Sequence, residues 1–125
     1  MEKIKLAIDM MGGDLGSSAT LEGVRKFLSI HKNDAELILV GKQEELIDAP
    51  CKVIDARDVL PMEAGPLEAL RAKESSMMKA IKLVKDNEAS GVVSCGSTGA
   101  YLSGAAISLK KIEGVERPAL ISPFP

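Results

Sequence analysis

The sequence predicts an α/β fold in which a mainly parallel sheet carries helices on both faces. Apolar, strand-like segments alternate with amphipathic helical segments along the 125 residues, which is typical of right-handed βαβ units. Hydrophobic residues make up 46% of the chain but aromatic residues only 2%, so aliphatic side chains must build the core. That composition suits helices packed on a buried sheet. The length fits a single domain, residues 1–125.

Apolar spacing predicts the elements of the first half of the chain. Residues 3–9 alternate apolar and other side chains and therefore form the first strand. Ser17 or Ser18 is expected to cap a helix that ends near His31. Residues 36–40 are a nearly continuous apolar run, which is typical of a strand buried on both faces. A short helix and a third strand follow, at residues 43–47 and 52–55.

Proline, glycine and serine mark the elements of the second half. Residues 56–65 form a loop, and Pro66 then suits the first position of a helix. Another helix starts after a break at Ser75 and Ser76. The remaining predicted elements are a fourth strand at residues 91–94, a helix from after Gly99 to about Lys111, and a fifth strand at residues 117–122. We interpret the end of the chain, directly after a strand, as a boundary within a longer protein.

Composition excludes several classes of protein. The formal net charge is −2, and the chain has neither a basic block nor a set of aromatic side chains with which to bind nucleic acid. No apolar stretch approaches the roughly 18 residues of a membrane-spanning helix, and we expect no signal peptide. Cys51 and Cys95 form neither a disulfide framework nor a metal-binding pattern, so we expect a cytoplasmic protein without a metal.

The most informative segment lies between the fourth strand and the helix after it, with the sequence Ser-Cys-Gly-Ser-Thr-Gly-Ala at residues 94–100. A helix start offers unpaired N–H groups and a partial positive charge, which favour an anion such as phosphate. Gly96 and Gly99 free the backbone there, and Ser97 and Thr98 add hydroxyl groups. The spacing matches neither a Walker A loop nor a dinucleotide fingerprint. The alternative is a tight turn whose glycines serve only packing.

A second glycine-rich turn, which contains Gly12 and Gly13, follows the first strand. In a parallel sheet, ligands bind beyond the carboxyl ends of the strands, and both turns are expected at that edge. Asp9 or Asp14, which flank this turn, could accept a proton, orient a substrate hydroxyl or hold a cationic partner. Each aspartate could instead be a turn-forming residue bonded to nearby backbone N–H groups.

Three other kinds of residue are candidates for chemistry. Arg71 and Lys73 lie in a polar break between two helices and could bind phosphate, although most such charges form a solvated surface. His31 is the only histidine and is expected at a helix end, which makes a histidine-based triad improbable. Cys95 could be a thiolate nucleophile, but a small buried side chain is the favoured interpretation.

Four segments, in this order and spacing, resemble the PlsX family of phosphate acyltransferases. Residues 7–14 are similar to the family's Asp-Ala-Met-Gly-Gly-Asp signature, and residues 69–77 to its Ala-Leu-Arg-x-Lys-x-x-Ser-Ser-Met segment. Residues 92–100 are similar to its Val-Ser-Ala-Gly-Asn-Thr-Gly-Ala loop, and residues 114–119 to its Gly-(Ile/Val)-x-Arg-Pro-Ala segment. The combination is far more specific than either glycine turn alone.

The resemblance implies transfer of a fatty acyl group from acyl carrier protein to inorganic phosphate, which gives acyl phosphate for phospholipid synthesis. It further implies a homodimeric, soluble enzyme that uses no cofactor and associates peripherally with the membrane. The implied fold is that of the isocitrate/isopropylmalate dehydrogenase and phosphotransacetylase group. Family members are commonly more than twice as long, so the chain resembles their N-terminal portion. It departs from the family at Ser97, where Asn is usual, and at Ala64-Gly65, where more polar residues are usual.

For that reaction, the turn after the fourth strand would hold phosphate or the oxyanion, and the turn after the first strand would shape the facing wall. One aspartate would manage the phosphate proton, and one cation would neutralise charge. The candidate catalytic residues are Asp9, Asp14, Ser97 and Thr98, and the candidate phosphate-binding residues are Gly12, Gly13, Arg71, Lys73, Gly96 and Gly99. Two alternatives are a phosphotransacetylase-like enzyme that uses acyl-coenzyme A and a non-catalytic fragment that binds phosphate or a partner.

Overall fold

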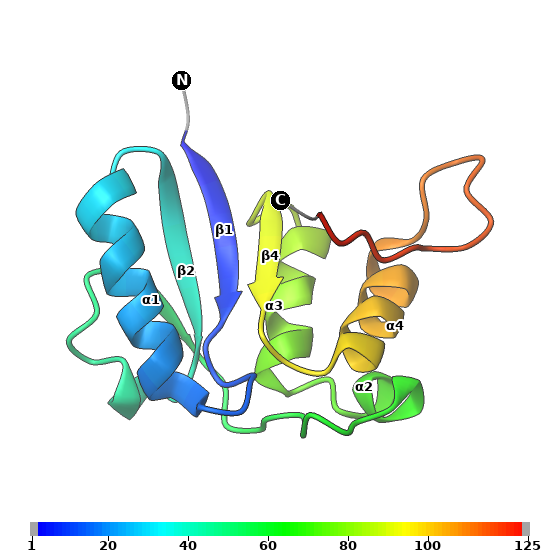
Figure 1. Cartoon of the computed structure of the whole chain (residues 1–125), viewed down its shortest axis with the longest axis horizontal. Coiled ribbons are helices and arrows are strands. Elements are labelled where there is room, and N and C mark those ends of the chain that lie inside the picture. Colours follow the sequence, from blue (N-terminus) through cyan, green and yellow to red (C-terminus); the bar gives the residue numbers. More distant parts are fainter. Residues whose placement is uncertain (1–2, 124–125) are drawn as a thin grey trace.

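The structure, a computed structural model, describes residues 3–123. Strands and helices alternate along this part of the chain, as the sequence predicts (Figure 1). The elements are β1 (Ile4–Asp9), α1 (Gly16–His31), β2 (Ala35–Gly41), the 3₁₀ helix η1 (Gln43–Glu45), β3 (Lys52–Asp55), α2 (Pro66–Arg71), α3 (Ser76–Lys85), β4 (Gly91–Ser94) and α4 (Thr98–Leu109). None of the helices in this range combines the length and the apolar character needed to cross a membrane.

The strands form one sheet in the order β3-β2-β1-β4, and every pair is parallel. Asp9, the last residue of β1, lies opposite Val40 of β2 on one side and opposite Ser94 of β4 on the other. The chain adds β2 and β3 to one side of β1 and then places β4 on the opposite side. The direction of strand addition therefore reverses between β1 and β4, which is where ligands bind in open parallel sheets.

Helices cover both faces of the sheet, as predicted. Figure 1 shows α1 in front of β2 and α3 behind β4. On the α1 side, Val24 belongs to a cluster with Leu37 and Leu39 of β2. On the α3 side, Ala80 joins a cluster with Ile38. Since neighbouring strand residues point to opposite faces, the continuous apolar run of β2 supplies both clusters.

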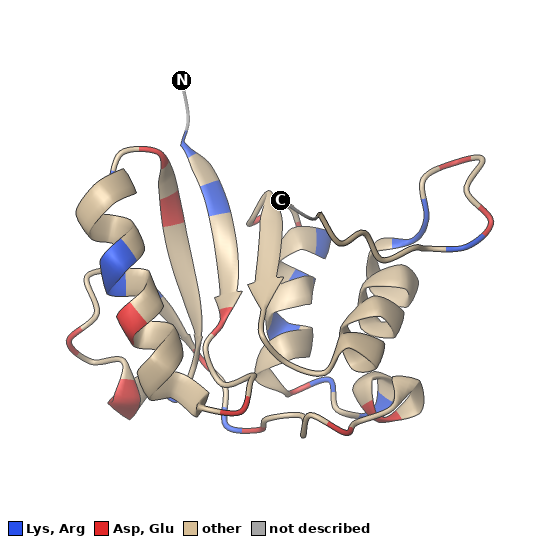
Figure 2. Cartoon of the chain, viewed as in Figure 1, with Lys and Arg blue, Asp and Glu red and all other residues tan. Residues whose placement is uncertain are grey.

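The last helix packs beside the helices of the α3 face. Gly104 of α4 lies so close to α3 that a Cβ there would be 2.7 Å from the sulfur of Met78. A third core cluster, which includes Ala69, Met77 and Ala100, joins α2, α3 and α4. No residue of α4 is charged (Figure 2). These contacts fix the position of the turn between β4 and α4.

Three predicted helix boundaries were wrong. α1 begins at Gly16 after Leu15 and has no side-chain cap, so neither Ser17 nor Ser18 caps it, because the positive φ of Gly16 (+68°) already turns the chain there. Residues 43–47 form only the short η1, since the buried Leu46 leaves the helical region. α4 starts at Thr98 rather than after Gly99. It ends at Leu109 instead of near Lys111, because the next residue, Lys110, takes a φ of +65° and leaves the helical conformation.

The predicted fifth strand at residues 117–122 was also wrong. This segment runs back past α4 as an irregular chain (Figure 1) and pairs with no strand among the described residues. Pro118 offers no N–H for a ladder, and Ile121 remains 90% exposed. The segment's apolar residues, Ala119, Leu120 and Ile121, do not form a strand without a partner edge and burial, since the cost of ordering the backbone is then not offset.

Candidate functional site

The two glycine-rich turns meet at the carboxyl edge of the sheet, between β1 and β4. A Cβ on Gly12 would lie 2.9 Å from the backbone nitrogen of Gly96. Gly13 has a φ of +103°, and a Cβ there would lie 3.2 Å from the Cβ of Cys95. Only glycine allows so close an approach between the turns, and at Gly13 the backbone conformation also favours it. The structure thus brings Gly12, Gly13 and Gly96 together at the reversal of strand order.

Asp9 lies beneath this contact and is 1% exposed. Its Oδ1 accepts hydrogen bonds from the backbone N–H groups of Met11 (3.1 Å) and Gly12 (3.2 Å). The same oxygen accepts a bond from the hydroxyl of Ser76 (2.5 Å), and Oδ2 accepts one from the hydroxyl of Ser94 (2.7 Å). One carboxylate therefore joins the first turn, the start of α3 and the end of β4.

Three of these four donors bond to Oδ1 and one bonds to Oδ2, and all four come from within the protein. The side chain is also 1% exposed, so a bound ligand could not reach the carboxylate without moving the residues around it. The turn-forming interpretation therefore describes Asp9 in this structure, and its contacts extend to two serines that are distant in sequence. Asp9 therefore stabilises the carboxyl edge of the sheet as a buried hydrogen-bond acceptor.

Ser97 is the N-cap of α4 and is 4% exposed. Its hydroxyl accepts a bond from the N–H of Ala100 (3.3 Å) and donates one to the carbonyl oxygen of Ala64 (2.7 Å). Both functions of the hydroxyl are thus satisfied inside the protein, and Ser97 ties α4 to the loop before α2. The hydrogen bond to Ala64 shows that this serine stabilises the structure, which its position in the sequence motif did not indicate.

Thr98 and Gly99 form the exposed first turn of α4. Their backbone N–H groups have no hydrogen-bond acceptor among residues 3–123, as expected for the first positions of a helix. A Cβ on Gly99 would meet no atom within 4 Å, so the space beside it is open. The Thr98 hydroxyl and these two N–H groups can bind an anion without breaking an existing bond.

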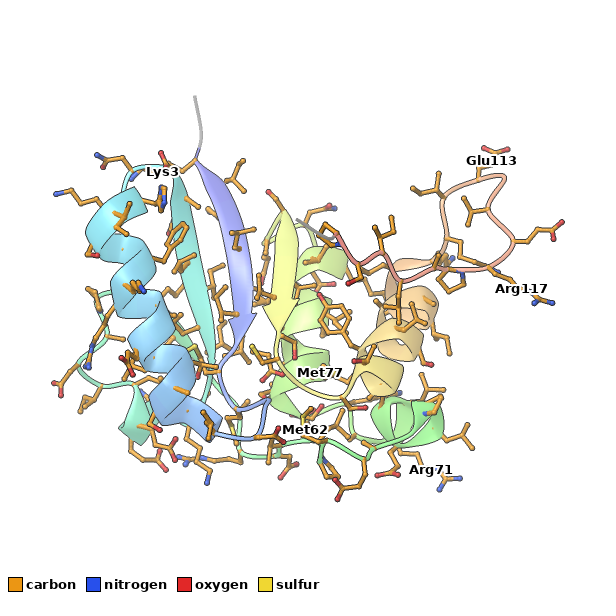
Figure 3. All side chains as sticks on the ribbon, viewed as in Figure 1. Lys3, Met62, Arg71, Met77, Glu113 and Arg117 are labelled. Atoms are coloured by element: carbon orange, nitrogen blue, oxygen red, sulfur yellow. The ribbon has the colours of Figure 1, made fainter. Side chains whose placement is uncertain are left out.

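The structure does not bring every candidate to this edge. Asp14 is exposed at the end of the first turn, where it lines the groove described below. Arg71 ends α2 and points away from the sheet (Figure 3), and Lys73 lies in the exposed link to α3. Within residues 3–123 neither cation forms an ion pair, and neither lines that groove. They form part of the solvated surface here.

A groove of about 650 Å³ opens from the two turns along the α1 face of the sheet. We call it the α1 groove. Its residues come from β1, the first turn, α1, β2 and the end of β4: Leu6, Ile8, Asp9, Gly12, Gly13, Asp14, Leu15, Gly16, Ala19, Thr20, Gly23, Val24, Phe27, Leu37, Val93, Ser94 and Cys95. Sequence reasoning missed this feature. The available signal was the pair of small residues Ala19 and Gly23 within the amphipathic pattern of α1.

Two side chains that could bear on the chemistry, Tyr101 of α4 and Cys51 just before β3, have shifted pKa values. The single tyrosine, Tyr101, donates a hydrogen bond to the carbonyl oxygen of Val92 (2.8 Å). Burial raises the pKa of Tyr101, and the negative charge of Asp9 raises it further. Burial also raises the pKa of the Cys51 thiol. Cys95 is exposed in the second turn, so the expectation that it is a buried side chain was wrong.

No group of three or more His, Cys, Asp or Glu side chains in the described range is arranged to hold a metal ion. The polar atoms at this edge are instead backbone N–H groups, hydroxyls and the carboxylate of Asp14. The backbone N–H groups and hydroxyls in this set can donate hydrogen bonds to an anion, orient it and stabilise an oxyanion, whereas the carboxylate is an acceptor.

Residues 4–125 match the family described as fatty acid synthesis protein. A phosphate acyltransferase from Pseudothermotoga lettingae is 45% identical over 123 residues, which cover 98% of this chain and 37% of that protein. A phosphate acyltransferase from Thermosipho melanesiensis is 42% identical over 125 residues, with 97% and 37% covered. One from Clostridium perfringens is 39% identical over 132 residues, with 98% and 39% covered. The chain thus spans less than two fifths of the length of these curated relatives.

Proposed function

The chain belongs to the fatty acid synthesis protein family, the PlsX family of phosphate acyltransferases, and from that premise we propose that it supplies the phosphate site for acyl transfer. The proposed reaction moves a fatty acyl group from acyl carrier protein to inorganic phosphate. The acyl phosphate product would enter phospholipid synthesis. The observation that carries the proposal is the contact of Gly12 with Gly96 at the reversal of strand order, beside the open first turn of α4.

Phosphate would bind at the start of α4. The unpaired N–H groups of Thr98 and Gly99 point out of a helix N-terminus, where a partial positive charge favours an anion. The Thr98 hydroxyl adds a donor beside them. Ser97 contributes indirectly, because its bonds to Ala100 and Ala64 hold the first turn in place.

The chemistry needs a positioned phosphate and a stabilised oxyanion. A phosphate oxygen attacks the thioester carbonyl carbon, and a C–O bond forms as the carbonyl oxygen becomes an oxyanion. Collapse of this intermediate breaks the C–S bond, and the released thiolate takes up the proton that the attacking hydrogen phosphate gives up. Phosphate is itself the nucleophile, so a side-chain nucleophile is not required. Fixed donors near Thr98 would lower the barrier by positioning phosphate and by stabilising the oxyanion.

The proposal includes a cytoplasmic homodimer that receives its acyl group from acyl carrier protein and associates peripherally with the membrane. Family membership supports this assembly. Exposed apolar side chains at the end of α4 and just after it, Ile107, Leu109 and Ile112, supply a surface suited to contact with another molecule.

Formation of acyl phosphate from acyl carrier protein thioester and inorganic phosphate tests the proposal. We would assay this chain beside the longer phosphate acyltransferase of Pseudothermotoga lettingae, and acyl-coenzyme A beside the carrier-protein donor. Phosphate binding would be measured in parallel by calorimetry. Transfer by this chain, or phosphate binding that Thr98→Val weakens, supports the proposal.

Other outcomes would identify other functions. A preference for acyl-coenzyme A would identify a phosphotransacetylase-like enzyme. Phosphate binding by this chain with no dependence on Thr98 would place the anion elsewhere. The absence of both phosphate binding and transfer would overturn the proposal.

A further inference from the structure

We propose that the α1 groove holds the hydrocarbon chain of the acyl substrate, with the reacting carbonyl at the two glycine turns. This inference rests on the proposed function, because that function supplies the occupant: an apolar chain that ends in one polar, reactive group. It assigns a substrate-binding surface to elements that carry no part of the phosphate site, namely α1 and the exposed face of β4.

The distribution of polar groups along the α1 groove matches such a ligand. Asp14, Ser94 and Cys95 line the groove where it meets the turns. Away from the turns its walls are almost entirely apolar, with Leu6 and Phe27 at the far end. An acyl thioester or an acyl phosphate has the same polarity, with one polar end and a hydrocarbon remainder.

The groove also has a length suited to an extended hydrocarbon chain. Along α1 it reaches from Gly16 to Phe27, and a helical rise of 1.5 Å per residue makes that about 16 Å. Ala19 and Gly23 face the groove with small side chains, so α1 leaves a channel there instead of filling it. A Cβ on Gly23 would meet no atom within 4 Å.

The wall opposite α1 is apolar surface that the described chain leaves uncovered. Val93 of β4 is 45% exposed on this side. Figure 1 shows that α1 covers the β2 side of the sheet, while no helix crosses the front of β4. A hydrocarbon chain in the groove would remove this surface from water, and the hydrophobic effect would favour its binding.

The groove opens beside the proposed phosphate. Cys95 lines the groove and is followed by Gly96 and the first turn of α4, and Gly13 touches Cys95 from the other turn. A carbonyl at this end of the chain would face Thr98 and Gly99 across the meeting point of the turns. The groove and the helix start therefore hold the two reactants from different sides.

Cys95 provides a readout that does not depend on turnover. It is the exposed cysteine, whereas Cys51 is half-buried with a pKa raised by burial, so a thiol reagent should modify Cys95 first. We would measure modification of each cysteine by mass spectrometry in the presence of saturated fatty acids of increasing length. Protection of Cys95 should strengthen about fourfold for each methylene that the groove buries, while modification of Cys51 stays unchanged.

Gly23→Leu places a leucine side chain in the open space of the groove. Leucine also has a higher helix propensity than glycine, so the variant should fold as well as the natural chain. It should weaken protection by long fatty acids at least tenfold and leave phosphate binding unchanged. Glu22→Leu is the matched control, because it adds the same side chain to the exposed neighbouring position of α1 that does not line the groove.

Three results would overturn the inference and leave the proposed function intact. The first is protection of Cys95 that does not depend on the length of the fatty acid, and the second is an equal effect of the two leucine variants. The third is self-association of the chain that fatty acids do not reverse and that Gly23→Leu abolishes. In the last case a second copy occupies the groove. Loss of phosphate binding and acyl transfer in the natural chain would instead overturn the proposed function itself.

Discussion

Gly12 and Gly96 come from turns that are 84 residues apart in sequence, yet a Cβ on Gly12 would lie 2.9 Å from the backbone nitrogen of Gly96. The same Cβ would lie 2.7 Å from Oδ2 of Asp9. The contact between the turns and the buried carboxylate below it are therefore one packed unit, and the first turn of α4 is positioned from it.

Gly12→Ala should destabilise the protein by about 1–3 kcal/mol, because the added methyl group must push the two turns apart. Urea unfolding measures this change. Gly23→Ala is the control, since its Cβ enters open space in a helix, and it should stabilise the chain by about 0.5–1 kcal/mol. Equal stability of Gly12→Ala and the natural chain would contradict the close approach.

Asp9→Ala should cost about 3 kcal/mol or more of unfolding free energy, because it leaves buried donors from the first turn, Ser76 and Ser94 without an acceptor. Thermal and urea unfolding provide the measurement. Asp14→Ala is the matched control at the exposed end of the same turn and should change stability by less than about 0.5 kcal/mol. If the two variants were equally stable, the proposed structural importance of Asp9 would be wrong.

Ser97→Ala should cost about 1–3 kcal/mol, since it removes the cap of α4 and leaves the carbonyl of Ala64 without its donor. Hydrogen exchange at the Ala100 N–H should accelerate with it. Ser97→Asn, which introduces the residue usual in the family, should keep much of the cap because Asn and Ser are similarly good at that position. Slow exchange at Ala100 in the alanine variant would contradict the capping function.

Thr98→Val should lower the rate of acyl phosphate formation on the order of a hundredfold, because it deletes one donor to the developing oxyanion and preserves the shape of the side chain. Thr98 is exposed, so unfolding free energy should change by less than about 0.5 kcal/mol. The rate of transfer and the stability are measured on the same preparation. An unchanged rate would remove Thr98 from the proposed site.

Tyr101 should titrate above its ordinary pKa of 10.0, because burial and the charge of Asp9 disfavour the phenolate. The chain has one tyrosine and no tryptophan, so ultraviolet absorbance reports this group alone. The unfolded chain loses its proton first as pH rises, so the stabilisation is complete below about pH 10 and declines as pH rises from there toward the folded pKa.

Asp9→Asn should move the midpoint of the Tyr101 titration back toward 10.0, provided the variant remains folded. Tyr101→Phe removes the absorbance change and identifies its source. A titration midpoint at or below 10.0 in the natural chain would contradict the partial burial of the phenol and its hydrogen bond to Val92.

Local pattern was sufficient for the four strands and for most helices. The apolar run of β2 and the alternation of side chains in β1 depend only on neighbouring residues. Pro66 and Ser75 mark the starts of α2 and α3 through backbone geometry, which is equally local. The segment 117–122 shows the limit of this reasoning. Its apolar run from Ala119 to Ile121 fits a strand, but a strand also needs a partner edge, which no local pattern contains.

The candidate site was predicted in outline, and its details were not. The two glycine turns had to follow parallel strands, so their shared edge could be inferred. The bonds of Asp9 to Ser76 and Ser94 span 67 and 85 residues, and nothing in the motif around Asp9 indicated them. Arg71 and Lys73 share a motif with Ser76, yet only the serine reaches the centre of the site.

By itself, the sequence determined the alternation of strands and helices, the family, and the positions of the glycines that allow close approach. The tertiary structure alone decided which donors remain free: the Ser97 hydroxyl is used inside the protein, whereas the first N–H groups of α4 are open. It alone decided that an apolar groove lies beside them. The physical reason is that periodicity and turn geometry belong to neighbours in the chain, while hydrogen-bond partners and cavities depend on the order in which the strands assemble.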